Sequence, residues 1–138
     1  MNMLYSFLSV AIGGAIGAML RYAIGLAMTS TAIGLPAFVA TLTVNVVGCA
    51  LMGLMAALIQ HYPEFAQGGR PFVSSVMMPF IMTGFLGALT TFSSFTLDAF
   101  TLLEKQDYGT LGLYMMASFA LSLTAFIAIY HLTKIGLS

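Results

Sequence analysis

Long apolar runs separated by a few charged residues are the main pattern of this chain. The uncharged stretches cover residues 1–20, 22–63, 71–97 and 108–133. A helix needs about 20 mostly apolar residues to cross the hydrocarbon core of a membrane. The longest stretch exceeds one such helix and contains a turn-forming segment between Thr29 and Pro36. The pattern therefore predicts four membrane-spanning helices, near residues 4–28, 36–60, 72–103 and 109–133.

Composition supports this interpretation. Hydrophobic residues make up 60% of the 138 residues, whereas charged residues make up 6%, against about 25% in soluble proteins. So few charges cannot cover a soluble surface, and a net charge of zero argues against a nucleic-acid partner. We expect a single all-α transmembrane domain over residues 1–138, embedded in the lipid bilayer, with no enzymatic activity.

The basic residues do not favour one orientation in the membrane. With four spans, Arg70 and Lys134 lie on one side, whereas Arg21 and Lys105 lie toward the other. Orientation follows the excess of Lys and Arg in short loops, and here the two sides are equal. Such a chain could insert in both directions, and two opposed copies could then pair in the membrane. A single orientation set by other signals is the alternative.

Four helices make a thin bundle, so an oligomer is the natural way to build a transport pathway. Small residues in the first span allow helices to approach closely: Gly13, Gly14, Gly17 and Ala18. They fit a contact between subunits, and they fit packing within one subunit equally well.

Two polar stripes interrupt apolar spans at the spacing i, i+4, i+8, which keeps their members on one helix face. They are Thr41, Asn45 and Cys49 in the second span, and Tyr114, Ser118 and Ser122 in the fourth. A single hydroxyl can bond to its own helix, but the amide of Asn45 needs several partners. Asn45 is therefore either an interhelical hydrogen-bonding residue or a group that contacts a solute in a pathway.

The third span contains two glycines and four hydroxyl residues in the segment GFLGALTTFSSF, residues 84–95. This composition predicts a broken helix, unwound around residues 87–91 and restarting near Phe92. Unwound backbone inside a membrane must be buried, hydrated or bound to an ion. Its free carbonyls suit a hard cation such as Na⁺, and the restarted helix favours an anion. Phe92 and Phe95 then share one face.

Hydrogen-bond donors outnumber acids in the spans. The middle of the first, second and fourth spans contains no carboxylate, and Asp98 is expected at the membrane interface near the end of the third. The donors are Arg21, the Asn45 amide and the hydroxyls of the fourth span, together with the positive edges of phenyl rings. This set indicates an anion or a small polar solute.

Three strings resemble the Fluc (CrcB) family of small fluoride channels: GGAIGAMLRY at 13–22, TLTVNVVG at 41–48 and GFLGALTTFSSF at 84–95. With the four-span layout, the resemblance covers essentially the whole chain. It implies an antiparallel, dual-topology homodimer with two fluoride pathways in the bacterial cytoplasmic (inner) membrane. It also implies passive fluoride efflux down the electrochemical gradient, which relieves fluoride toxicity.

The resemblance implies roles for individual residues. Phe92 and Phe95 match the phenylalanines whose ring edges line the pathway, and Asn45 matches the pore asparagine. Arg21 matches an arginine of the aqueous vestibule. The backbone carbonyls of Gly87 and Thr90 match the ligands of a structural Na⁺ on the dimer axis. The predicted fluoride pathway is thus formed by Thr41, Asn45, Phe92, Phe95, Tyr114, Ser118 and Ser122.

This chain departs from the family pattern at Leu121 and Ala88, where many members have Gly, and at Ser94, where many have Thr. The changes at Ala88 and Ser94 are small and remove no predicted ligand, whereas Leu121 leaves the packing beside Ser122 open. The main alternative function is a small coupled exporter of the fluoride/proton or drug antiporter type. The four-span multidrug exporters need an embedded Glu in the first helix, and residues 1–28 contain no acid. A membrane subunit without transport activity is a third hypothesis, which a broken third helix disfavours.

Overall fold

Four helical spans form the part of the chain that the computed structural model describes, residues 3–65 and 70–138. The spans are α1 (Met3–Thr29), α2 (Ala37–His61), the third span (Val73–Glu104) and α5 (Tyr108–Leu137). All four are long and apolar enough to cross a membrane. The sequence prediction is confirmed to within a residue at nearly every end, except that the last helix continues to Leu137 rather than ending near 133.

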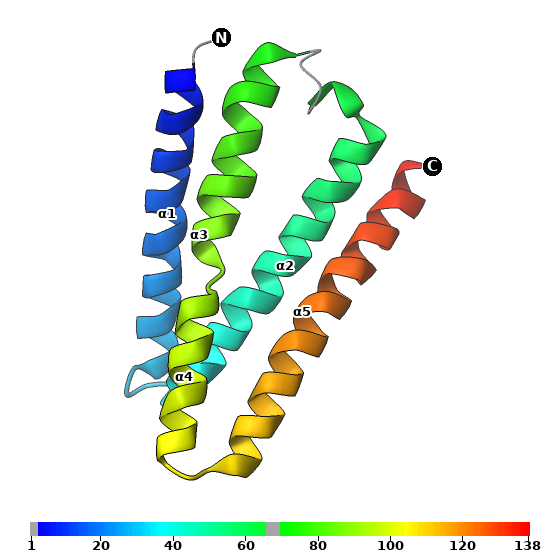
Figure 1. The fold of residues 1–138 in the computed structure, drawn as a ribbon. Coiled ribbons are helices and arrows are strands. Elements are labelled where there is room, and N and C mark those ends of the chain that lie inside the picture. Colours follow the sequence, from blue (N-terminus) through cyan, green and yellow to red (C-terminus); the bar gives the residue numbers. More distant parts are fainter. Residues whose placement is uncertain (1–2, 66–69) are drawn as a thin grey trace.

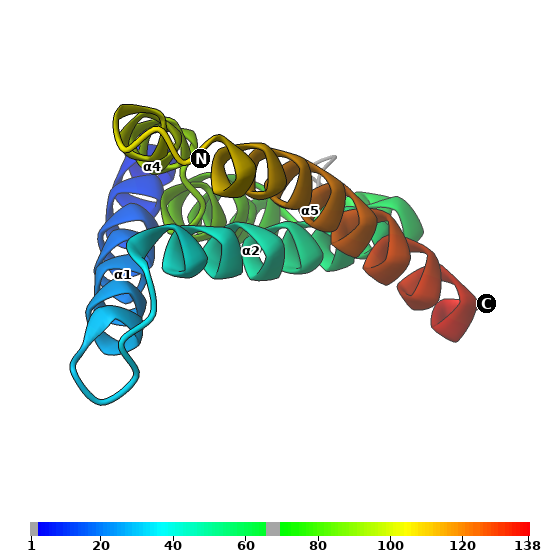
Figure 2. The same cartoon turned by 90° about the horizontal axis from the view of Figure 1, so that it is seen from below.

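The start of α1 and the end of α5 lie at the same end of the molecule, together with the end of α2 and the start of the third span (Figure 1). The links that follow α1 and precede α5 lie at the opposite end. Within this arrangement α1 packs along the third span, and α2 packs along α5. The view from below shows α5 running beside α2, away from α1 (Figure 2). The up-and-down order of spans expected from hydropathy is therefore present.

Local chemistry explains where the helices begin and end. Pro36 precedes α2 with φ −59°, and the preceding turn passes through Gly34 at φ 67°, a conformation that glycine adopts without strain. Asp107 caps α5 by accepting a hydrogen bond from the backbone N–H of Thr110 at 3.1 Å. The hydrogen bonds from Thr110 hold the pKa of the Asp107 carboxyl below its ordinary value.

The third span is built from several segments. Two π-helical segments, Val73–Met77 and Pro79–Leu86, lead into the short helix α3 (Gly87–Leu89). The chain is extended at Thr90 and Thr91, and helix α4 (Phe92–Glu104) follows. The predicted restart at Phe92 is confirmed, but the predicted unwinding over 87–91 was too wide, because residues 87–89 remain helical. The π-helical winding was not expected from the sequence.

Glycines bring α1 into backbone contact with the third span. A Cβ atom built on Gly13 would lie 2.4 Å from the carbonyl oxygen of Phe80, and one on Gly17 would lie 2.2 Å from that of Phe85. Gly84 approaches α1 in the same way, since its Cβ would lie 2.7 Å from the carbonyl oxygen of Val10. Gly13 and Gly17 therefore serve packing within one subunit, which decides between the two alternatives for them.

The buried core is small and surrounds the third span. Val44, Leu86 and Leu89 form its centre, with Ile24, Met52 and Phe85 among the partly buried residues packed against them. Large apolar side chains such as Met3, Met19, Met116 and Phe119 remain more than 70% exposed. Apolar exposure on this scale is expected of a surface that faces lipid or another apolar chain.

We expect Gly17→Ala to destabilise the protein by about 1–3 kcal/mol, the usual cost of forcing extra atoms into a packed contact. The added methyl would have to displace the backbone of the third span. Thermal unfolding in detergent, followed by the loss of the monodisperse species, measures this effect. Gly25→Ala is the matched control on the same helix, because a Cβ there meets nothing within 4 Å. Equal melting temperatures for both variants would contradict the prediction.

Candidate functional site

The break in the third span exposes backbone groups that an unbroken helix would pair internally. Thr90 has φ −79° and ψ 154°, and Thr91 has φ −152° and ψ 121°, so both are extended. Thr91 then caps the new helix, because its Oγ1 accepts a hydrogen bond from the backbone N–H of Ser94 at 3.1 Å. Backbone polar groups in a low-dielectric interior need such partners, and neighbouring helices supply the others.

Asn45 pairs with the backbone of the break from α2. Its Nδ2 donates to the carbonyl oxygen of Thr91 at 3.1 Å, and its Oδ1 accepts from the Thr91 N–H at 2.8 Å. Of the two alternatives for Asn45, the interhelical hydrogen bond is therefore present. The amide keeps a second N–H and a second lone pair, so contact with a solute is compatible with this pairing.

The carbonyl groups of Gly87 and Thr90 are among those at the break that lose their usual helical donors. In a continuous helix the Gly87 carbonyl would accept from the N–H of Thr91, which here donates to Asn45. The Thr90 carbonyl would accept from the N–H of Ser94, which here donates to the Thr91 hydroxyl. These are the two carbonyls that the sequence resemblance implicates in Na⁺ binding.

Arg21 reaches the break from α1. Its Nε donates to the carbonyl oxygen of Ala88 at 3.1 Å, and its Nη1 donates to Oγ of Ser94 at 3.4 Å. The side chain also lines a small pocket of about 370 Å³ with Thr41, Thr91 and Ser94. Arg21 is thus half-buried and attached to both sides of the break.

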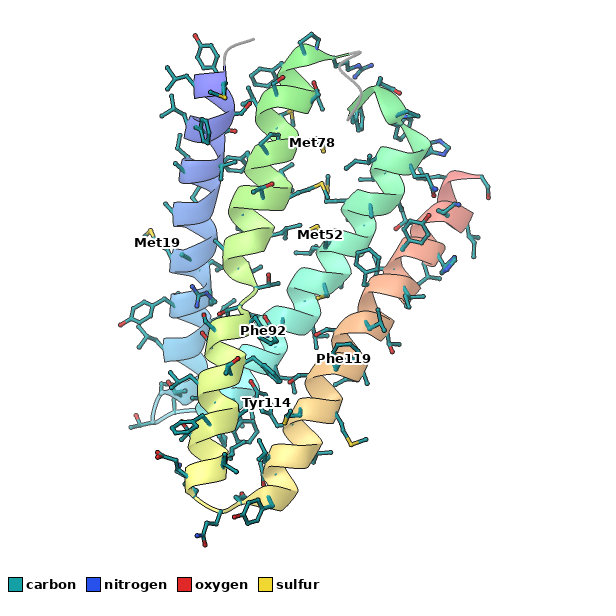
Figure 3. All side chains as sticks on the ribbon, in the orientation of Figure 1. Met19, Met52, Met78, Phe92, Tyr114 and Phe119 are labelled. Atoms are coloured by element: carbon teal, nitrogen blue, oxygen red, sulfur yellow. The ribbon has the colours of Figure 1, made fainter. Side chains whose placement is uncertain are left out.

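An open groove of about 1020 Å³ runs between the break, α2 and α5. It brings together most of the predicted site: Asn45, Gly87, Thr90, Phe92, Phe95, Ser118 and Ser122. Figure 3 shows Phe92 just below the break, with Phe119 on the neighbouring α5. None of the described residues that line the groove is charged. Its polar groups are hydroxyls, one thiol, one amide and backbone carbonyls.

A row of aromatic rings continues from the groove toward the end of the bundle at which α2 and α5 begin. The ring centroids of Phe92 and Phe95 lie 5.5 Å apart, and those of Phe95 and Tyr114 lie 5.2 Å apart. Phe38 follows at 5.4 Å from Tyr114. All three pairs are tilted, so that ring edges and faces are both presented along the row. Phe92 is 80% exposed, which places its ring at the open end of this row.

Asp98 ties the lower ends of three helices together. Its Oδ2 accepts hydrogen bonds from Oγ1 of Thr41 at 2.6 Å and from the hydroxyl of Tyr114 at 3.3 Å. These bonds link α4 to α2 and α5. The interfacial position expected for Asp98 stays a prediction, and the structure adds that Asp98 is a half-buried acceptor of two predicted pathway hydroxyls.

Ser118 carries a buried hydroxyl that makes no hydrogen bond within residues 3–65 and 70–138. The residue is 7% exposed and lies on the groove wall. An unpaired buried hydroxyl costs free energy unless a solute or a water molecule forms a hydrogen bond with it. It is a free donor next to the groove, although its oxygen is itself buried.

Each predicted polar stripe is divided between two places. Asn45 and Cys49 line the groove, whereas Thr41 points to Asp98 and the smaller pocket. Ser118 and Ser122 line the groove, whereas the Tyr114 hydroxyl reaches Asp98. Sequence reasoning missed the part played by Asp98 and the apolar groove residues Met115 and Phe119. The spacing of four residues between Tyr114 and Ser118 indicated that they share a helix face. Nothing in the sequence indicated that Asp98 would accept a hydrogen bond from Tyr114.

The fold and the groove define a multi-pass membrane protein with an uncharged, largely apolar groove beside an interrupted helix. Comparison with known families matches residues 8–130 to the CrcB-like protein, Camphor Resistance (CrcB) family. The chain belongs to this family.

The relatives of the chain include several proteins named fluoride-specific ion channel FluC. That of Paracoccus denitrificans (strain Pd 1222) is 42% identical over 91% of this chain and 92% of its own length. Those of Ruegeria sp. (strain TM1040) and Rhizobium leguminosarum bv. trifolii (strain WSM2304) are 45% and 46% identical over 89% and 88% of this chain, and 90% of each relative. These relatives are described as ion channels and not as enzymes, and the multi-pass chain is a protein of the cell membrane.

We expect Asp98→Ala to lower the free energy of unfolding by about 1–3 kcal/mol, because two hydroxyls lose a charged acceptor. Thr41→Val in the Asp98→Ala background should then cost less than it does in the wild type. Unfolding in detergent, arranged as a double-mutant cycle, measures the coupling. Glu104→Ala, an exposed carboxylate on the same helix, should change little. Additive effects of Thr41→Val and Asp98→Ala would count against the linkage.

Proposed function

We propose that this protein is a fluoride-selective ion channel that exports fluoride passively and thereby relieves fluoride toxicity. Membership of the CrcB family and relatives named fluoride-specific ion channels support the class of activity. The observation that carries the proposal is the groove itself, which is lined by hydroxyl, amide and phenyl groups and by no charged residue among those described.

The chemistry of the groove suits a small anion that gives up part of its hydration. Hydroxyl and amide donors at Ser118, Ser122 and Asn45 replace water, and the positive edges of Phe92 and Phe95 add further stabilisation. Neutral donors bind an anion without holding it as tightly as a fixed cation would, which conduction requires. In this proposal Thr41 and Tyr114 serve the pathway at its lower end, where Asp98 orients their hydroxyls.

The proposed assembly is an antiparallel homodimer with two pathways, one along each groove. The groove is open on one side of the single chain, and Gly87 and Phe92 at its rim are exposed. A second chain laid over this face would close the groove. The equal numbers of basic residues on the two sides support opposite insertion of the two chains.

A structural Na⁺ is proposed where the freed carbonyls of Gly87 and Thr90 meet those of the second chain. The donor set fits, because hard cations take oxygen ligands and both carbonyls have lost their helical donors. Two carbonyls from one chain are too few for such an ion, whereas two chains supply four. The cation would neutralise the carbonyl dipoles at the break and hold the two chains together.

We expect purified protein in liposomes to release fluoride rapidly and to release chloride much more slowly, as followed with ion-selective electrodes. Phe92→Ile should slow fluoride release by about tenfold or more, which corresponds to about 1.4 kcal/mol of lost stabilisation of the ion. Phe7→Ile is the matched control, since Phe7 is 64% exposed on α1 and lies outside the groove. Wild-type rates in Phe92→Ile would contradict the pathway.

The same assay separates the channel from a coupled exporter. A passive channel releases fluoride at a rate that follows the fluoride gradient and the membrane voltage, with no requirement for an opposing proton gradient. An antiporter requires the counter-ion, and a membrane subunit without transport activity gives no release. Release that depends on an imposed proton gradient would therefore favour the exporter.

We expect two lysines added to the 105–107 connection to bias insertion toward one orientation, because short-loop charge sets topology. If opposed chains form the channel, fluoride efflux should fall by about tenfold or more as insertion becomes one-way. Co-expression with a variant that carries two lysines in the connection between α2 and the third span, which the order of the spans places on the other side of the membrane, should restore it. Full activity of a variant with demonstrated one-way insertion would contradict the antiparallel dimer.

A further inference from the structure

The face of α1 that meets the third span carries Gly13, Gly17 and Arg21 at intervals of four residues. The two glycines allow backbone contact, since a side chain at either would overlap the carbonyls of Phe80 or Phe85. One turn beyond Gly17, the same face therefore lies directly against the break. This spacing delivers the Arg21 guanidinium to the carbonyl of Ala88.

The two hydrogen bonds of Arg21 fall on opposite sides of the break. Ala88 belongs to the segment before it and Ser94 to the helix after it. In a continuous helix the Ala88 carbonyl would accept from the N–H of Phe92, but the extended residues between them interrupt that geometry. Arg21 Nε supplies the missing donor, and the planar guanidinium reaches Ser94 at the same time.

Ser94 connects Arg21 to the cap of α4. Its Oγ accepts from Oγ1 of Thr91 at 3.1 Å, and its backbone N–H donates to the same Thr91 oxygen. Arg21 is therefore joined through Ser94 to the residue that starts the second half of the span. Asn45 fixes Thr91 from the other side. The break is held between α1 and α2 by these two side chains.

We propose that Arg21 is a positioning residue that fixes the geometry of the helix break, and not chiefly a charge that attracts anions in a vestibule. Its bonds set how α3 and α4 are oriented relative to each other. They thereby fix the directions of the neighbouring Gly87 and Thr90 carbonyls and of the Phe92 ring. The consequence for fluoride transport rests on the function proposed above, whereas the structural part does not.

Charge and geometry make different predictions for Arg21→Lys and Arg21→Gln. Lysine keeps the positive charge but replaces the planar fork by a single ammonium group. A positioning role predicts that both variants slow fluoride efflux by about tenfold or more, at low and at high ionic strength alike. A vestibule charge predicts that lysine retains the wild-type rate and that the defect of glutamine shrinks as salt screens the charge. The second pattern would overturn the proposal.

A stability measurement tests the structural part without any transport assay. Ser94→Ala removes one partner of Arg21 and changes no charge. Unfolding in detergent should show that Ser94→Ala costs less in the Arg21→Gln background than in the wild type, because the bond is already absent. Thr101→Ala should cost the same in both backgrounds, because the exposed Thr101 hydroxyl donates to the Leu97 carbonyl of its own helix, away from this network.

Additive effects of Arg21→Gln and Ser94→Ala would overturn the proposal whatever the transport result. Coupling in the unfolding cycle with no fluoride release from the wild-type protein would keep the positioning role and reject the proposed function. If Arg21→Gln does not assemble, Arg21→Lys takes its place in the cycle, since lysine cannot reproduce both bonds of the guanidinium.

Discussion

The unpaired backbone at the break in the third span is the constraint on which the rest of the structure depends. A membrane interior offers no water to the backbone groups that the break releases, so other parts of the chain must meet them. Arg21 from α1, Asn45 from α2 and the side chain of Thr91 do so. The close glycine contacts follow from this need, because α1 must approach the third span before Arg21 can reach it.

Hydropathy predicted the four spans almost to the residue, because length and apolarity alone decide whether a helix can cross a membrane. The break was also visible, since glycines and hydroxyl residues are poor occupants of a plain apolar helix. The length of the break could not be predicted, because Gly87–Leu89 can be helical or extended. The pairing of Thr91 with Asn45 fixes where the helix stops. The π-helical winding upstream has no sequence signal that we recognise.

The members of each polar stripe face two different places, which shows a limit of inferring a shared helix face from residue spacing alone. Residues four apart differ by about 40° around a helix, so the first and third members of an i, i+4, i+8 stripe differ by about 80°. Thr41 and Cys49 therefore need not face the same space, and the structure turns Thr41 toward Asp98 while Cys49 lines the groove. The acceptor lies on another helix, 57 residues away along the chain, and spacing within one helix cannot reveal it.

The strongest charges near the pathway are already occupied by protein groups. Asp98 accepts two hydroxyls, and Arg21 donates to Ala88 and Ser94. Neither residue is among the described residues that line the groove, so neither offers a fixed charge at the groove wall. The groups left to a solute are the remaining capacity of Asn45, the unpaired Ser118 hydroxyl and the edges of Phe92 and Phe95. Each is individually weak, and in the proposed pathway an ion that exchanges water for weak partners in sequence can both enter and leave.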